Sequence, residues 1–278
     1  MLRLLAVSDI HHSLLDNQLI DALKQELAKR DSTSVDYVLC PGDFLNLKDE
    51  DQQSDERVSE AEQQVHQMCA TLSQFGTVLL VPGNHDPHTM FDGTFDTPSN
   101  VVNVHGTSVE IAPNLNVVGF GGSPEALQDS SVRWTGYPFQ SQAEAAAAFA
   151  ASNVEQHVNC NTILLTHVGP ATSSTCIDTR DLRKHDNRGV ISCGLDFLDA
   201  LLVESESPPF LLVHGHVHNA AGFVKSNNTR VLNPGALKCG NFALVTLRHQ
   251  ETGTWQLGQV TMIDINQSYD ALFSPPSK

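Results

Sequence analysis

Residues 2–12 read LRLLAVSDIHH, a short apolar run that ends in a polar Asp-x-His segment. Apolar runs of this length, bounded by polar or turn residues, are typical of buried strands. Similar runs recur at residues 37–40, 78–81, 117–120, 162–165 and 210–213. Helix-like segments separate the runs, with apolar residues every three or four positions in the second of them. They cover residues 14–30, 55–75, 141–157 and 192–203. The first third of the chain is therefore predicted to be β-α-β-α-β.

The pattern changes in the last quarter of the chain, where strand-like segments are separated by Asn-Asn, Pro-Gly and Thr-Gly turns. These segments, which we expect to form antiparallel hairpins, are residues 222–225, 230–232, 242–248 and 255–263. A parallel part followed by hairpins predicts an α/β protein of mixed type. Its expected architecture is a four-layer αββα sandwich, with two mixed β-sheets flanked by helices. We expect one domain over residues 1–266 and a flexible tail over residues 267–278.

The charge of the chain limits its partners. It carries 16 Lys and Arg against 32 Asp and Glu, a formal net charge of −16, which argues against long nucleic acids and anionic membranes as partners. Hydrophobic residues make up 40% of the 278 residues, enough to form a folded core. The first apolar run, residues 4–7, is too short for a signal peptide or a membrane span. The six cysteines form no CxxC pair, so we expect reduced thiols and a cytoplasmic location.

Eight of the 13 histidines fall in four clusters at or near the ends of predicted strands. In open α/β sheets, sites are built at the carboxyl ends of the strands. Acidic and amide side chains accompany these histidines. In chain order, the segments are Asp9-Ile10-His11, Gly42-Asp43, Gly83-Asn84-His85-Asp86, Thr166-His167 and Gly215-His216-Val217-His218. We expect the segments to converge on one pocket.

Seven of these side chains are candidate metal ligands: Asp9, His11, Asp43, Asn84, His167, His216 and His218. One octahedral ion that keeps water needs fewer ligands, so the number favours two ions. Asp43 is the natural bridge because a carboxylate offers two oxygens. In an extended segment alternate residues face the same way, which directs Asp9 and His11 to one ion. Nitrogen and oxygen ligands without a thiolate favour Mn, Fe, Zn, Co or Ni.

The ordered set D-x-H, G-D, G-N-H-D, H and G-H-x-H, over residues 9–218, resembles the motifs of the calcineurin-like metallophosphoesterase superfamily. Asn233-Pro234-Gly235-Ala236 also resembles the NPG turn of many small members. The resemblance implies an αββα sandwich, in agreement with the layers predicted from the elements. It further implies two divalent metal ions and hydrolysis of phosphoesters by direct attack of metal-bound hydroxide, without a covalent phosphoenzyme.

Matching the chain motif by motif to this family assigns roles to the candidate residues. The resemblance implies that the first ion is held by Asp9, His11, Asp43 and His218. It implies that the second is held by Asp43, Asn84, His167 and His216. His85 is not expected to bind metal. It would assist the leaving oxygen as a proton donor, with Asp86 orienting its imidazole.

The sequence after the second motif limits the classes of substrate that we expect. The chain reads Gly42-Asp43-Phe44-Leu45-Asn46 where Ser/Thr protein phosphatases continue with x-V-D-R-G, so their phosphate-binding arginine is missing. The motifs look closer to those of small class III phosphodiesterases. We therefore expect phosphodiesters, or small phosphorylated metabolites and nucleotides, as substrates. A phosphomonoesterase or nucleotide pyrophosphatase of the same fold, and a protein-assembly scaffold like the retromer subunit, remain open as alternatives.

Three further residues are candidates for substrate binding. Arg180 and Arg183 lie in the polar segment 169–189, where guanidinium groups can bind a second phosphate. The alternative is a solvated loop balanced by its own aspartates. His12 adjoins the first motif and can contact substrate. The pattern leaves the oligomeric state open.

Overall fold

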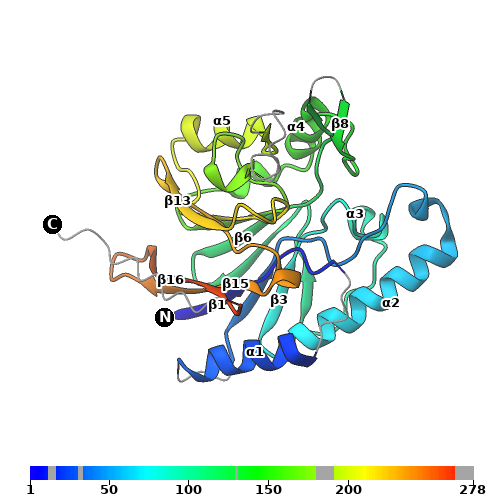
Figure 1. Cartoon of the computed structure of the whole chain (residues 1–278). Coiled ribbons are helices and arrows are strands. Elements are labelled where there is room, and N and C mark those ends of the chain that lie inside the picture. Colours follow the sequence, from blue (N-terminus) through cyan, green and yellow to red (C-terminus); the bar gives the residue numbers. More distant parts are fainter. Residues whose placement is uncertain (12–16, 31–33, 129–130, 180–190, 267–278) are drawn as a thin grey trace.

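The computed structural model describes residues 1–11, 17–30, 34–128, 131–179 and 191–266 (Figure 1). Three residues proposed from the sequence to bind substrate, His12, Arg180 and Arg183, lie outside these ranges, as does the expected tail at 267–278. Two six-stranded sheets form the centre of the molecule, with helices on their outer sides. The predicted fold class, two mixed sheets flanked by helices, is confirmed.

The first sheet combines the start of the chain with its last two strands. In spatial order it contains β16 (Trp255–Asp264), β15 (Asn241–His249), β1 (Leu2–Ala6), β2 (Tyr37–Cys40), β3 (Thr77–Leu80) and β4 (Val101–Asn103). Strands β1 to β4 run parallel, and β15 pairs antiparallel with both β1 and β16. The last hairpin of the described chain therefore extends the sheet that the first β-α-β units begin.

The second sheet is built from the middle of the chain. In spatial order it contains β13 (Gly222–Ser226), β14 (Thr229–Asn233), β12 (Leu211–Val213), β9 (Thr162–Thr166), β6 (Leu115–Phe120) and β5 (Ser108–Ala112). The four central strands are parallel, and the edge strands β13 and β5 are antiparallel to their neighbours. The two predicted hairpins are thus divided between the sheets.

Side chains of the sheets alternate between two kinds of core. Leu4 and Ala6 of β1 pack between the sheets, whereas Leu5 packs on the opposite face. That opposite face is covered by α1 (Asn17–Ala28) and α2 (Asp55–Leu72). The outer face of the second sheet is covered by α4 (Gln142–Ala151) and α5 (Asp196–Glu204), which contribute Phe149 and Leu198. Strands covered on both faces are apolar throughout, which is why they stood out in the sequence.

Several short elements were not predicted. They are α3 (Thr89–Asp92), the pair β7 (Ala126–Gln128) and β8 (Ser131–Trp134), the pair β10 (Ile177–Asp178) and β11 (Ile191–Ser192), and the edge strands β4 and β5. Single 3₁₀ turns cover Asp51–Gln53, Val154–His157, Ser174–Cys176 and Leu237–Cys239. The segment expected to be a loop from residue 169 onward therefore contains a turn and a strand before residue 180. Within the described ranges, no helix combines the length and apolarity needed to cross a membrane.

Candidate metal centre

Five parallel strands, three from one sheet and two from the other, lead into the loops that carry the candidate ligands. The strand ends and the first ligand after each are β1 with Asp9, β2 with Asp43, β3 with Asn84, β9 with His167 and β12 with His216. Backbone hydrogen bonds join these loops. The Asp9 amide donates to the Gly42 carbonyl at 3.1 Å, and the Gly215 amide donates to the His167 carbonyl at 3.0 Å. Each of these bonds joins two loops of one sheet. The His216 amide, which donates to the Asp9 carboxylate at 3.1 Å, connects the loops of the two sheets.

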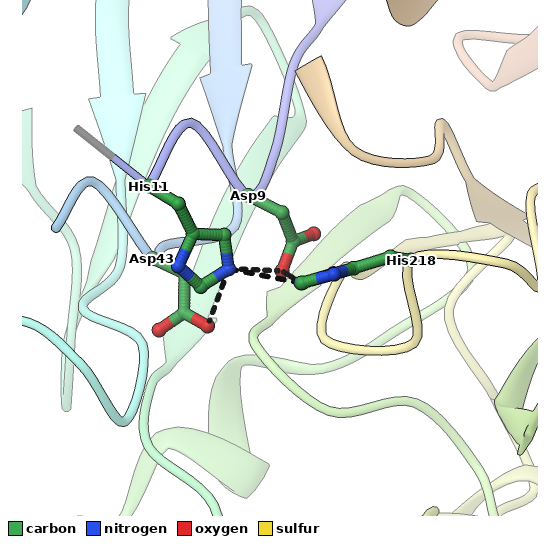
Figure 2. A group of neighbouring side chains, drawn as sticks. All are labelled: Asp9, His11, Asp43 and His218. Atoms are coloured by element: carbon green, nitrogen blue, oxygen red, sulfur yellow. Dashed lines mark hydrogen bonds and ion pairs between the residues drawn. The ribbon is translucent and has the colours of Figure 1, made fainter. Parts of the chain in front are cut away.

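The first group of side chains is Asp9, His11, Asp43 and His218, whose potential ligand atoms all lie within 4.8 Å of one another. Figure 2 shows the two imidazoles and the two carboxylates turned toward a common point. Nε2 of His11 lies 2.9 Å from Nε2 of His218 and 3.5 Å from Oδ2 of Asp43. Nε2 of His218 lies 3.2 Å from Oδ1 of Asp9. This spacing suits several ligands of one ion.

A second group, Asp43, His167 and His216, lies beside the first and shares Asp43 with it. Nε2 of His167 is 3.5 Å from Oδ2 of Asp43, the same oxygen that faces His11. The Asn84 side chain completes this group, because its Oδ1 lies 3.0 Å from Nε2 of His167 and 3.1 Å from Nδ1 of His216. The structure thus brings together all seven side chains that the sequence singled out.

The protonation of His167 tests whether these residues fit a metal ion. Its Nδ1 lies 2.7 Å from the carbonyl oxygen of Pro41, which can only accept, so Nδ1 carries the ring proton. The lone pair of Nε2 then faces Oδ1 of Asn84 and Oδ2 of Asp43. The amide nitrogen of Asn84 donates elsewhere, to the Thr135 carbonyl at 3.4 Å. Acceptor atoms therefore face one another, an arrangement that a cation stabilises, and the donor set fits divalent metal ions.

The two buried carboxylates of the centre are held in their ionised form. Burial by itself raises the pKa of Asp9, but the hydrogen bond and charge of His218 outweigh it and hold that pKa well below its ordinary value. Burial also raises the pKa of Asp43, while the charges of neighbouring histidines, His167 first, bring it below the ordinary value. A carboxylate binds a metal ion in its ionised form, so both candidate ligands have the charge that binding requires.

Two imidazoles of the centre, those of His216 and His11, have pKa values shifted in the direction that keeps them neutral. Burial lowers the pKa of His216 to about 3, with a further contribution from the charge of His167. Burial also lowers the pKa of His11. A neutral imidazole keeps a lone pair, so these rings are ready to bind a cation near neutral pH.

Unusual backbone conformations concentrate at the centre. Among the described residues, eight other than glycine have positive φ, and four of them are candidate ligands: Asp9 (55°), His11 (48°), Asp43 (57°) and His216 (68°). This left-handed region is sparsely populated by such residues and is frequent at functional sites. The expectation that Asp9 and His11 share a direction because they lie in an extended segment is wrong. β1 ends at Ala6, and two left-handed residues turn the loop so that both side chains face the same point.

Two glycines provide the room that the carboxylates need. A Cβ atom on Gly83 would lie 2.2 Å from Oδ1 of Asp43. A Cβ atom on Gly215 would lie 1.9 Å from Oγ of Ser8 and 2.6 Å from Oδ2 of Asp9. All three distances are far shorter than van der Waals contact. The lack of a side chain at these two positions therefore allows the backbone to approach the candidate metal-binding carboxylates closely.

His85 lies at the edge of the centre, with its ring centroid 5.5 Å from that of His11. Its backbone amide donates to Oδ1 of Asp43 at 3.0 Å, and its Nδ1 lies 3.0 Å from the Leu47 carbonyl oxygen, to which it donates. The Leu47 carbonyl therefore fixes the ring and leaves Nε2 unprotonated in the neutral form.

The Asp86 side chain does not orient His85 as expected from the sequence. It is fully buried, and its oxygens accept backbone hydrogen bonds at 2.8 to 3.2 Å from Gly83, Asp43, Phe44 and Leu45. A buried carboxylate must satisfy several lone pairs, and the turn after β2 presents three consecutive amides that do so. Asp86 thus clamps the loop after β2 to the loop after β3.

Two asparagines at the centre were not predicted as site residues. Asn46 contacts His11 through both its oxygen and its nitrogen. Asn233, in the Asn-Pro-Gly turn, donates to the carbonyls of Val217 and Thr175 at 3.0 and 3.2 Å and thereby supports the loop that carries His216 and His218. Asn233 was marked in the sequence only as part of the Asn-Pro-Gly turn, without a role, and Asn46 shows no charge or spacing that marks it in a single sequence.

Solved structures with the same fold include proteins of several descriptions. The chain aligns with TT1561 of Thermus thermophilus at 15% identity and a TM-score of 0.52, over 92% of this chain and 98% of that one. It aligns with a dimetal phosphatase from Danio rerio at 14% identity and a TM-score of 0.51, over 95% and 98%. It aligns with GAP50, the anchor in the inner membrane complex of Plasmodium, at 11% identity and a TM-score of 0.52, over 98% of this chain and 87% of that one.

Sequence comparison gives a more specific result. A search of curated proteins finds no significant match. The profile of one family, described as calcineurin-like phosphoesterase, matches residues 2–238. That range contains all five motifs and most of both sheets. The chain belongs to the calcineurin-like phosphoesterase family.

Proposed function

We propose that this protein is a dinuclear metal-dependent phosphodiesterase that acts on small phosphodiesters or phosphorylated metabolites. The observation that carries the proposal is the shared carboxylate. Oδ2 of Asp43 lies 3.5 Å from the Nε2 atoms of both His11 and His167, which belong to two separate ligand groups. A carboxylate that serves two neighbouring groups suits a pair of cations better than one cation.

Each ligand group would hold one divalent ion: Asp9, His11, Asp43 and His218 the first, and Asp43, Asn84, His167 and His216 the second. When bound, such ions neutralise the phosphoryl oxygens and lower the pKa of water for attack on phosphorus. Nitrogen and oxygen donors suit Mn²⁺ among the ions expected from the sequence.

His85 would supply the proton that the leaving oxygen needs. Its Nδ1 is bound to the Leu47 carbonyl, so Nε2 is the ring atom that can carry and release a proton. The hydrogen bond from its backbone to Asp43 ties the position of this acid to the shared ligand. An alkoxide leaves a diester poorly without protonation, so this group matters most for substrates with poor leaving groups.

The first experiment compares two model substrates. The purified protein is assayed with bis-p-nitrophenyl phosphate and with p-nitrophenyl phosphate in the presence of Mn²⁺, Co²⁺, Ni²⁺, Zn²⁺ or Mg²⁺, and its metal content is measured. We expect two ions per chain and faster cleavage of the diester. Preference for the monoester would replace the proposal with a phosphomonoesterase of the same fold. Bound metal without hydrolysis of any ester in a wider panel would favour the scaffold alternative.

Replacing His85 tests the assignment of the acid. The variant His85→Ala is expected to keep both metal ions and to lose turnover by a factor of about 10² to 10⁴. The loss should be largest for a diester with an alkyl leaving group, because p-nitrophenolate leaves without protonation. Asp43→Asn is the matched comparison, since it should lose metal as well as activity. If His85→Ala keeps the wild-type kcat on the alkyl diester, another group donates the proton.

A further inference from the structure

Asn46 holds the candidate ligand His11 at two points. Oδ1 of Asn46 lies 2.6 Å from Nδ1 of the His11 ring, and Nδ2 of Asn46 donates to the His11 backbone carbonyl at 3.0 Å. The two residues are far apart in sequence, in the loops after β1 and β2. One amide group therefore fixes both the ring and the backbone of a residue whose φ is 48°.

These two contacts determine which ring nitrogen of His11 carries the proton, and therefore which nitrogen has a free lone pair for a metal ion. Since Nδ2 of Asn46 is used as a donor to the carbonyl, the atom facing the ring is the amide oxygen, which only accepts. Nδ1 of His11 must then carry the ring proton, and Nε2 keeps its lone pair. Nε2 is the atom that lies 3.5 Å from Asp43 and 2.9 Å from His218. Asn46 thus selects the tautomer that can bind a cation.

The two ligand groups differ in this respect. In the second group, the corresponding proton of His167 is held by the Pro41 carbonyl at 2.7 Å, a backbone atom that no side-chain substitution removes. In the first group, the proton of His11 is held by the Asn46 side chain. A substitution at residue 46 should therefore disturb one group and spare the other.

We propose that Asn46 is a positioning residue for the first metal ion: it fixes the tautomer and the backbone of His11, so that without it the first ion binds weakly while the second stays bound. This inference rests on the pair of metal ions in the proposed function. It goes beyond it by assigning separate affinities to the two ions and naming the residue that sets one of them.

Asn46 lines a cavity, so a larger apolar side chain can replace it without a steric clash. The cavity has a volume of about 310 Å³ and is lined by His11, Asn46, Arg57, Glu60 and Gln64 among others. A leucine at position 46 has space to avoid a clash. Nδ1 of His11 would then lose its only hydrogen-bond acceptor within the described part of the chain, and the ring would be free to exchange tautomers. The expected consequence is weaker metal binding in a folded protein.

The experiment measures metal binding directly. Metal-free wild-type protein and the variant Asn46→Leu are titrated with Mn²⁺ in a calorimeter, and bound metal is counted after gel filtration. The wild type should bind two ions. In Asn46→Leu, one binding step should weaken by about 10- to 100-fold, the range for groups that orient a ligand, and the other should keep its wild-type affinity.

Two further variants separate positioning from a general structural effect. Asn46→Asp keeps an oxygen facing Nδ1 of His11 but loses the donor to the His11 carbonyl, so it should restore part of the affinity of the weakened step. Gln64→Leu removes a polar side chain from the same cavity and should bind two ions like the wild type. Equal affinities in Asn46→Leu and wild type, equal weakening of both steps, or an Asn46→Asp variant that binds the first ion no more tightly than Asn46→Leu would each overturn the proposal. Hydrolysis is assayed separately, so a wild type that binds two ions but cleaves no ester refutes the proposed function and leaves this inference standing.

Discussion

At the scale of single residues, the charge state of each ligand follows from what surrounds it. Asp43 is buried, and its two oxygens have different partners: Oδ1 accepts from the His85 amide, and Oδ2 faces His11 and His167. The neighbouring imidazoles keep this carboxylate ionised despite burial. One side chain therefore couples the two ligand groups to the candidate acid.

His105 offers a pH test away from the metal centre. Burial lowers its pKa from the ordinary 6.5 to about 4, and its Nδ1 accepts a hydrogen bond from the Gly121 amide at 2.9 Å, which a protonated ring cannot do. The unfolded chain binds this proton near pH 6.5 and the folded chain only near pH 4. The free energy of unfolding should therefore fall as the pH drops from 6.5 to 4, by up to about 3 kcal/mol from this residue.

Urea unfolding of wild type and His105→Gln at several pH values measures this contribution. The variant should be less stable near neutral pH, and the difference between the two proteins should shrink toward pH 4. His249→Gln, at an exposed position, serves as the control and should follow the wild type. A difference between wild type and His105→Gln that stays constant over this pH range would show that His105 is not the titrating group.

The sequence made it possible to choose the side chains that meet at the centre, but not to predict the way they are held. The Asp, Asn and His residues could be chosen because their types and order after strand-like runs suit metal binding. The left-handed backbone at Asp9 and His11 could not be inferred, since it depends on hydrogen bonds to the loop after β2, such as that from the His11 amide to the Asp43 carbonyl at 3.0 Å. The Asp86 side chain likewise accepts from the amides of residues 43 to 45, and Asn46 contacts His11, so most of their partners are also distant in sequence.

At the scale of elements, the strength of the apolar pattern decided what was predictable. β9 is buried at all five positions, and β3 at three of four, so both appeared as apolar runs. β4 and β5 are edge strands with only one fully buried residue each, Val101 and Ile111, so their composition is mixed. α4 was recognised by its composition, although its Ala-rich sequence shows little periodicity. Which strands are neighbours in each sheet could not be predicted, because no local stretch of sequence indicates it.

The contact between the loops after β2 and β3 gives a prediction at this scale. Gly83 packs against the Asp43 carboxylate so closely that a Cβ atom would lie 2.2 Å from Oδ1 and 2.4 Å from the Asp43 amide nitrogen. In Gly83→Ala the two loops must separate, and the shared ligand must move. We expect two or more orders of magnitude loss of phosphodiesterase activity, in line with the sensitivity of catalysis to misplacement of about 1 Å.

Metal analysis of the same variant shows whether the activity is lost for that reason. Gly83→Ala should bind fewer than two ions per chain. Gly93→Ala is the matched control, because a Cβ atom there meets nothing within 4 Å, although its positive φ of 80° adds some strain. Full metal content together with wild-type kcat in Gly83→Ala would mean that the loops tolerate separation.

At the scale of the whole molecule, the excess of negative charge and the buried carboxylates favour bound cations. The net charge is −16, and Asp9 and Asp43 are almost fully buried. Cations that bind only the folded chain stabilise it, by about 2.7 kcal/mol at a free concentration of 100 times Kd. For a chain of this size that corresponds to roughly 5 °C or more in Tm.

Thermal unfolding with and without a chelator measures this effect. Chelation should lower the Tm of the wild type, and adding Mn²⁺ should restore it. Asp43→Asn should show a much smaller shift, because it lacks the shared ligand. A wild-type Tm that is the same in chelator and in excess Mn²⁺ would contradict binding of metal by the folded state.

The pairing of β1 with β15 has a consequence for how the protein reaches its folded state. It joins residue 2 to residue 247, and the bridge between Ser8 and Ala236 lies just before Asp9. The strand β1 can therefore gain its second neighbour only after the residues up to Leu247 have left the ribosome. Contacts between such distant positions slow folding, because a large loop must close before they form. Assembly of the first ligand loop should thus be a late event, and nascent chains that stop short of residue 249 should leave one edge of β1 exposed to other strands.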